Sequence, residues 1–229
     1  MIKLINISCF LLVSLLGYSK TTYSNQIILT NEEVNDLTFL YEEEKLARDV
    51  YYFAYEKYEL EIFKTIASSE QNHMNKILSL LKNNGIKTPN KLNGEFSNHK
   101  IQELYNKLTK QSEQSLIEAL KVAVTIEELD IYDIESFKKR TDNSLILNVY
   151  TQLTCGSKNH LRVFYKQILK EKSSYEAQYI SKKNFKSIVK GSNKPCGNKT
   201  KAKEQMKKGK GNGQGKGHGS GMRKGRGKC

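Results

Sequence analysis

The sequence predicts an all-α fold, a four-helix bundle with a long crossover between its second and third long helices. Three observations predict it. Between residues 29 and 180, apolar residues recur at the helical spacing of about 3.6 residues, helix start and stop signals bracket the periodic stretches, and Pro89 is the single proline. A region of this length suits one domain with one hydrophobic core.

The first helix is expected over residues 30–58, with a Thr-Asn-Glu-Glu capping box that begins at Thr30. Three consecutive acids cross its apolar face. At about 100° per residue, only Glu44 falls near the middle of that face, whereas Glu42 points away and Glu43 lies at the edge. The first helix therefore directs the carboxylate of Glu44 toward the core.

The second helix, expected over residues 61–83, carries Glu70 and His73 on its apolar side. Residues three apart lie on one face of a helix, so both side chains point in the same direction. A carboxylate and an imidazole are costly to bury unless something compensates them, and a divalent metal ion compensates both. The alternative is a surface Glu-His pair on a stripe that is misphased by one residue.

The remaining helices are expected over residues 98–110, 112–139 and 144–171. The first of them is short and lies in the crossover, whose length lets the second and third long helices run parallel. Glu127 falls in the centre of the apolar stripe of the third long helix, Glu128 points sideways, and Asp130 lies at the margin one turn beyond Glu127. His160 lies on the apolar side of the fourth.

Four long helices thus each place a ligand-type side chain on a core-facing stripe. One inward acid is easily a misphased surface residue, but four independent misphasings need a common reason. A carboxylate and histidine metal site in the bundle core is such a reason, and these donors suit iron or manganese, with one or two ions per chain. The predicted ligands are Glu44, Glu70, His73, Glu127, Asp130 and His160.

Four segments of the sequence resemble the bacterial ferritin-like domain of unknown function 2202. They are residues 41–51, 66–74, 126–133 and 156–162, one on each predicted long helix, and the resemblance covers about residues 29–180. It implies a ferritin-like four-helix fold and brings no established activity with it. Ferritin-like proteins typically use Glu on the first helix, Glu-x-x-His on the second, Glu on the third and Glu-x-x-His on the fourth.

The candidate ligands match that arrangement except at one place, where Ser157 stands three residues before His160 instead of Glu. The resemblance implies a bridging carboxylate at that place, so the second ion lacks a ligand unless Asp130 supplies one. Without it, we expect one ion or a weakly bound second ion. Tyr51, one helical repeat after Glu44, is either an electron donor to the metal or a core aromatic residue.

The N-terminus has the layout of a secretory signal peptide: Lys3, then an apolar run over residues 5–16, then small residues that suit cleavage. An uncleaved anchor is the alternative, but the run is shorter than the roughly 20 residues of a spanning helix. We therefore expect a leader over residues 1–24 and an exported protein, periplasmic or extracellular.

The C-terminal residues 191–229 carry most of the basic charge. They contain 11 of the 15 glycines, 12 of the 38 Lys and Arg residues and a single acid, Glu204, so their net charge is +11 of the formal +14. Such a segment has nothing apolar to bury and is predicted to be disordered. It is either a tether to a polyanion, such as nucleic acid, an acidic cell-surface polymer or anionic lipid, or a solubilising tail.

Three cysteines follow the predicted leader. Cys196 and Cys229 lie in the predicted tail and are able to close a loop, whereas Cys155 lies in a helical pattern and is predicted to be a small buried hydrophobic residue. The sequence has no Cys-x-x-Cys spacing, so a structural zinc site is not expected.

Three functions remain open from the sequence. The first is a di-iron oxidase or peroxidase, and the second is a non-enzymatic binder of metal or of a polyanion, alone or as an oligomer. The third is a purely structural bundle, in which the inward acids and histidines pair with Arg48, with Arg162 or with one another.

Overall fold

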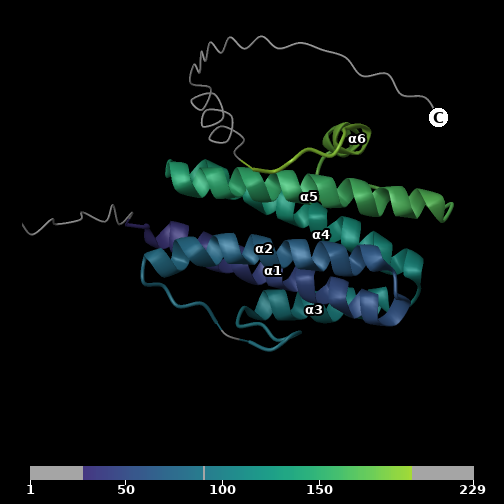
Figure 1. Ribbon diagram of the computed structural model, residues 1–229, viewed down its shortest axis with the longest axis horizontal. Coiled ribbons are helices and arrows are strands. Elements are labelled where there is room, and N and C mark those ends of the chain that lie inside the picture. Colours follow the sequence, from purple (N-terminus) through teal and green to yellow (C-terminus); the bar gives the residue numbers. More distant parts are fainter. Residues whose placement is uncertain (1–27, 90, 198–229) are drawn as a thin grey trace, which may run out of the picture.

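The computed structural model describes residues 28–89 and 91–197, and it is all-helical in these residues (Figure 1). The elements are α1 (Asn31–Tyr58), α2 (Glu61–Asn83), α3 (His99–Ser112), α4 (Leu116–Phe137), a 3-10 turn η1 (Lys138–Arg140), α5 (Ser144–Lys170) and α6 (Lys182–Lys190). The predicted all-α class and the order of the helices are confirmed. None of the described helices is both long and apolar enough to cross a membrane.

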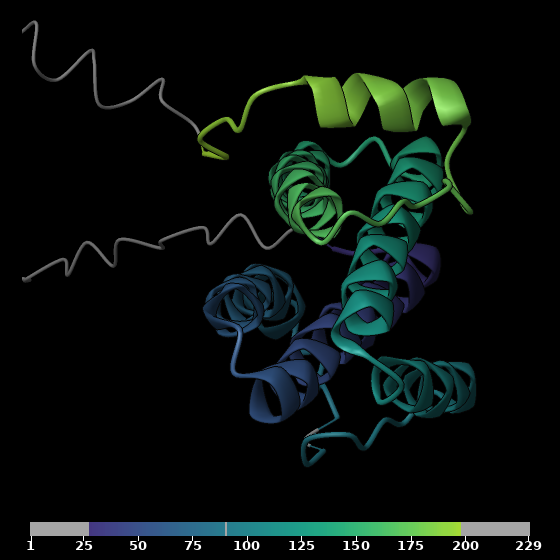
Figure 2. The ribbon, with the colours of Figure 1, turned by 90° about the vertical axis from the view of Figure 1, so that its right-hand side faces the viewer.

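The four long helices form the bundle. α1 packs along α2, α4 packs along α5, and the two pairs meet through α1 with α4 and α2 with α5 (Figures 1 and 2). The crossover helix α3 lies outside the bundle against α1 and α4, and α6 lies on the outer side of α5. The predicted four-helix bundle with a helix in its crossover is therefore confirmed.

Local hydrogen bonds explain where the helices begin. The Thr30 hydroxyl accepts from the amide N–H of Glu33 at 3.2 Å and the Glu33 carboxylate accepts from the amide of Thr30 at 2.9 Å, which is the predicted capping box. α4 begins at Leu116, four residues later than predicted, because the Ser115 hydroxyl caps it by accepting from the Glu118 amide at 3.1 Å.

The crossover is held against α1 by buried acids. Glu42 points away from the bundle core, as predicted, and its two oxygens accept from the amides of Ser97 and Asn98 at 2.7 Å each. Asp49 accepts from Lys45 at 2.6 Å and from the Gly94 amide at 2.9 Å. These charge-assisted bonds fix the segment that enters α3.

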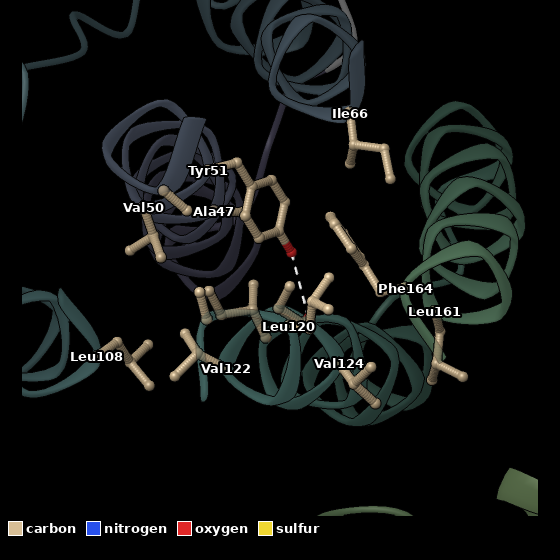
Figure 3. Packing of buried hydrophobic residues seen from close by; sticks show 14 of the residues in the cluster. Ala47, Val50, Tyr51, Ile66, Leu108, Leu120, Val122, Val124, Leu161 and Phe164 are labelled. Atoms are coloured by element: carbon tan, nitrogen blue, oxygen red, sulfur yellow. Dashed lines mark hydrogen bonds between the residues drawn. The ribbon is translucent and has the colours of Figure 1, made fainter. Parts of the chain in front are cut away.

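The core consists of two apolar clusters with a polar band between them. One cluster includes Tyr51, Ile66 and Phe164, which come from α1, α2 and α5 and approach one another in Figure 3; the Tyr51 and Phe164 rings are 5.0 Å apart. The other includes Leu40 and Leu153 toward the opposite end of the bundle. On each long helix the predicted ligands fall in the band between these clusters.

The cysteine prediction is wrong. Cys155 is half-buried and forms a disulfide bond with Cys196, with a Cα–Cα distance of 5.6 Å. The chain that follows α6 returns along α5, where the Asn159 side chain pairs with the backbone of Lys194 through bonds of 2.8 and 3.1 Å. This return places Cys196 beside Cys155, so Cys196 is not available to Cys229.

Helical structure continues past residue 180, the predicted end of the four-helix domain. α6 and the strap formed by residues 191–197 follow residue 180 and pack on α5, so the first residues of the predicted tail are attached to the bundle. The predicted leader over residues 1–24, and residues 198–229 of the predicted tail with Cys229, lie outside the described residues.

Candidate metal centre

The polar band brings five predicted ligands together in the middle of the bundle. Glu44 comes from α1, Glu70 and His73 from α2, Glu127 from α4 and His160 from α5. The three acidic residues are fully buried, and the residues His73 and His160 are 3% and 9% exposed. The inward direction that the apolar stripes predict is the direction that these side chains take.

The five side chains form two groups that share Glu70. In the first group, the His73 Nδ1 atom lies 3.1 Å from Glu44 Oε2 and 2.7 Å from Glu70 Oε2. In the second, the His160 Nδ1 atom lies 2.7 Å from Glu70 Oε1 and 3.5 Å from Glu127 Oε1. Within each group the donor atoms lie within 4.8 Å of one another, which is close enough for one ion to contact all three residues.

Several of these donor atoms have no hydrogen-bond partner. They are Glu44 Oε1, both oxygens of Glu70, Glu127 Oε2 and His160 Nδ1, and all are buried. The two Glu70 oxygens nevertheless lie within ion-pair distance of the histidines, at 2.7 Å from His73 Nδ1 and 2.7 Å from His160 Nδ1. Buried polar atoms without partners are costly, and a divalent cation among them removes that cost. The donor set of carboxylates and imidazoles without sulfur fits iron or manganese.

Burial and the short distances between the acids and histidines shift the pKa values of the centre. Burial raises the pKa values of Glu44 and Glu127 to about 7 against the opposing effect of the neighbouring histidines. Burial alone would raise the pKa of Glu70 too, but His160 and His73 outweigh it and hold that pKa well below its usual range. The carboxylates of Glu44 and Glu70 overcome burial and raise the pKa of His73 to about 10. Without a metal, the centre therefore carries protons that a cation has to displace.

Asp130 lies beside the two groups and belongs to neither. It is fully buried, and both of its carboxylate oxygens lack a hydrogen-bond partner. Burial, followed by the negative charges of Glu44 and Glu43, raises its pKa well above the usual range. The Asp130 carboxylate interacts with the charges of the Glu44, Glu127 and Glu70 carboxylates. Its role as a metal ligand stays a prediction.

Sequence reasoning missed Glu43. It is only 3% exposed, shares a hydrogen bond with the Asp133 carboxyl group on α4, and leaves Oε2 without a partner. Burial and the charge of Asp133 raise its pKa well above the usual range. The run of three acids was the available signal, but helical phase alone put Glu43 at the edge of its face.

α5 contributes an imidazole and a close backbone contact. Ser157 donates to the Leu153 carbonyl at 3.1 Å within its own helix, so its hydroxyl is used there. A Cβ atom at Gly156 would lie 2.5 Å from His73 Nε2, so only glycine lets the α5 backbone approach that ring. The rings of His73 and His160 stack with centroids 5.6 Å apart. Sequence reasoning gave Gly156 no such role.

The two arginines are engaged elsewhere, so of the pairings in the purely structural hypothesis only that of the inward acids and histidines with one another is present. Arg48 donates to Asp49 at 2.7 and 2.8 Å and also binds Gln71, while Arg162 donates to Asn193 at 2.9 Å and to the Ile188 carbonyl. Neither guanidinium group neutralises an acid of the centre, so the predicted role of Arg48 and Arg162 is wrong.

Tyr51 lies between the apolar cluster and the centre. Its ring belongs to the core, as one reading of the sequence expected, and its hydroxyl donates to Glu127 Oε1 at 2.8 Å. Burial and the Glu127 carboxylate raise its pKa well above the usual range. The phenol therefore keeps its proton and orients Glu127.

The comparisons with known proteins agree with this fold. A curated relative, an uncharacterized protein (MJ0754) of Methanocaldococcus jannaschii, is 46% identical over 166 residues, which cover 72% of this chain and 90% of the relative. The crystal structure of the hypothetical protein MJ0754 matches with a TM-score of 0.72 and 45% identity, over 73% of this chain and 97% of that one. The model of an uncharacterized protein domain, DUF2202, matches residues 33–192, and this chain therefore belongs to the DUF2202 family.

Proposed function

We propose that this protein binds two divalent transition-metal ions, iron or manganese, in the middle of its helical bundle. One observation carries the proposal: the fully buried Glu70 carboxylate lies between two imidazoles, with one oxygen 2.7 Å from His73 Nδ1 and the other 2.7 Å from His160 Nδ1, so it belongs to both donor groups. In this arrangement Glu70 contacts both ions, Glu44 and His73 complete one site, and Glu127 and His160 complete the other.

The charges of the centre support two ions. Three carboxylates and two neutral imidazoles leave one positive charge when two divalent ions are bound, and an ionised Asp130 would cancel it. A buried site is stable when its charges are paired, so the isolated Asp130 carboxylate is explained by the same proposal. The ions would displace the protons that His73 and His160 hold.

The proposal extends to redox chemistry of the ferroxidase or peroxidase type. Bound iron or manganese would supply one-electron chemistry toward oxygen or peroxide. The chain's own part is to exclude water from the fully buried carboxylates and to orient Glu127 through the Tyr51 hydroxyl. The Tyr51 hydroxyl is also hydrogen-bonded to the candidate ligand Glu127, which suits an electron donor.

Metal titration tests the proposal. Protein purified without a metal-affinity tag and stripped with a chelator should take up Fe(II), added without oxygen, or Mn(II), and elemental analysis should find two ions per chain. Glu44→Gln should lose one of them. Glu42→Gln is the matched control, because Glu42 is a buried acid on the same helix that binds the crossover instead. Absence of bound metal, with a melting temperature unchanged by Fe(II) or Mn(II), would contradict metal binding.

Two further proposals rest on the sequence alone. We propose that the protein is exported by its N-terminal segment, which mass spectrometry of the mature N-terminus would test. We also propose that residues 198–229 tether it to a polyanion. A chain that ends after residue 197 keeps the Cys155–Cys196 bond and should lose salt-sensitive binding to DNA or anionic vesicles.

A further inference from the structure

An open pocket of about 630 Å³ lies at the surface where α1, α4 and the crossover meet. Three acids line it, Asp36, Glu42 and Asp133, against one basic residue, Arg140. Arg140 pairs with Asp36 at 2.6 Å, and Glu42 binds the backbone of the crossover. Asp133 is therefore the acid of this pocket that is least engaged by cations or amides.

Asp133 connects the pocket to the interior. It is half-buried on α4 and shares its hydrogen bond with Glu43, which is almost fully buried on α1. Asp130, one helical turn before Asp133 on α4, interacts electrostatically both with Glu43 and with Glu44 and Glu70 of the centre. The three carboxyl groups thus form a series from the pocket to the centre.

The inner members of the series have unused binding capacity. Glu43 Oε2 and both oxygens of Asp130 are buried without any hydrogen-bond partner, and Asp130 is fully buried. No salt bridge to any of the three acids occurs in the described part of the chain. Carboxylates that serve only to stabilise a fold are usually paired, because an unpaired buried acid destabilises it.

We infer that Asp133, Glu43 and Asp130 form the access route by which a divalent cation passes from this pocket to the metal centre. The inference rests on the proposed function. Each carboxylate replaces part of the hydration shell of the ion. The ion passes from Asp133 on α4 to Glu43 on α1 and then to Asp130 on α4, one turn closer to the centre. The occupant is a hydrated divalent transition-metal cation, which fits the carboxyl oxygens of the series and displaces the protons that the buried acids hold.

A second pocket, on the α5 side, makes the assignment more specific. It has about 410 Å³ and is lined by four basic residues and by no acid: Lys138, Lys158, Arg162 and Lys194. Such a surface repels cations, whereas the pocket at Asp133 attracts them. The two pockets therefore differ in the sign of charge that they admit.

The rate of Co(II) uptake tests the route. Metal-free protein is mixed with Co(II) in a stopped-flow instrument, and the visible absorption of the bound ion reports uptake. Asp133→Lys should slow uptake by about tenfold or more at low salt while the final amount of bound Co(II) stays that of the wild type. Glu43→Gln, which keeps the side-chain volume, should slow it too.

Glu135→Lys is the matched control, because this substitution changes the net charge by the same amount as Asp133→Lys. Glu135 is an exposed acid on the same helix, two residues from Asp133. Uptake at the wild-type rate in Asp133→Lys and Glu43→Gln would overturn the route, as would equal slowing by Glu135→Lys. If the wild type binds no Co(II) at all, the proposed function itself fails and the route falls with it.

Discussion

The two helices that carry the histidines serve the centre in different ways. α2 presents Glu70 and His73 from adjacent turns, and both side chains reach the donor groups. α5 presents His160, while Ser157, one turn earlier, bonds to its own helix backbone and Gly156 packs against the His73 ring. α5 therefore offers the centre one donor residue and a backbone surface against the His73 ring, and Glu70 is the carboxylate common to both donor groups.

The largest effect is expected for Glu70→Ala. Because Glu70 is common to both donor groups, this change should lower the metal affinity of both sites by about 100-fold or more. That loss is larger than the one expected when a residue that only supports a ligand is changed. Calorimetric titration with Mn(II) measures it. Loss of one ion with the other retained would show that the two sites do not share Glu70.

A smaller loss is expected for Gly156→Ala. The added Cβ would lie 2.5 Å from His73 Nε2, so the imidazole has to shift from the position in which its Nδ1 contacts Glu44 and Glu70. We expect an affinity lower by roughly tenfold at the His73 site, in line with changes around metal ligands, and a less stable fold. Wild-type affinity in this variant would show that the α5 backbone does not position His73.

The pH dependence of stability distinguishes the protonated centre from the metal-bound one. A group whose pKa is higher in the folded than in the unfolded protein stabilises the fold at low pH, and this contribution is lost as the pH rises. The contributions of Glu44 and Glu127 are therefore lost between about pH 4.5 and 7. The contribution of His73 is lost between about pH 6.5 and 10. Glu70, whose pKa is lowered, keeps its contribution throughout that range.

Urea unfolding of chelator-treated protein should therefore show a free energy of unfolding that is lower at pH 9 than at pH 5 by several kcal/mol, because each pKa unit corresponds to about 1.4 kcal/mol. Protein saturated with Mn(II) serves as the control, because its ligands have already lost their protons and its stability should not fall in this way. A metal-free protein that is equally stable at both values would contradict the pKa shifts of the centre.

The smallest effect is expected for Ser157→Ala. The hydroxyl bonds only to the Leu153 carbonyl, so its removal should cost about 1 kcal/mol or less of stability. Metal affinity should change by less than about twofold, because the residue offers the centre no donor atom. Thermal unfolding and Mn(II) titration measure both, and a marked loss of one ion would make Ser157 a ligand.

The sequence predicted the features that depend on local pattern. Helical periodicity and the Thr30 capping box placed the long helices, and the same periodicity directed Glu44, Glu70 and Glu127 toward the core. The family resemblance to DUF2202 is confirmed as well. Whether these side chains hold a metal stays a prediction that the geometry supports.

The features that the sequence did not predict depend on which segments cover the bundle. Glu128 was expected to point sideways, yet it is fully buried, because Tyr175 and the Gln178 amide bind its carboxylate at 2.7 and 2.8 Å. The strap over α5 similarly brings Cys196 to Cys155. Helical phase within one helix contains no information about such contacts between distant segments.

The most direct test of the metal centre is an anomalous difference map from crystals of the Mn(II)- or Fe(II)-loaded protein. We predict two peaks inside the bundle, one beside His73 Nδ1 and one beside His160 Nδ1, with Glu70 in contact with both. A map without a peak among these side chains, at a metal concentration that saturates the protein, would contradict the account.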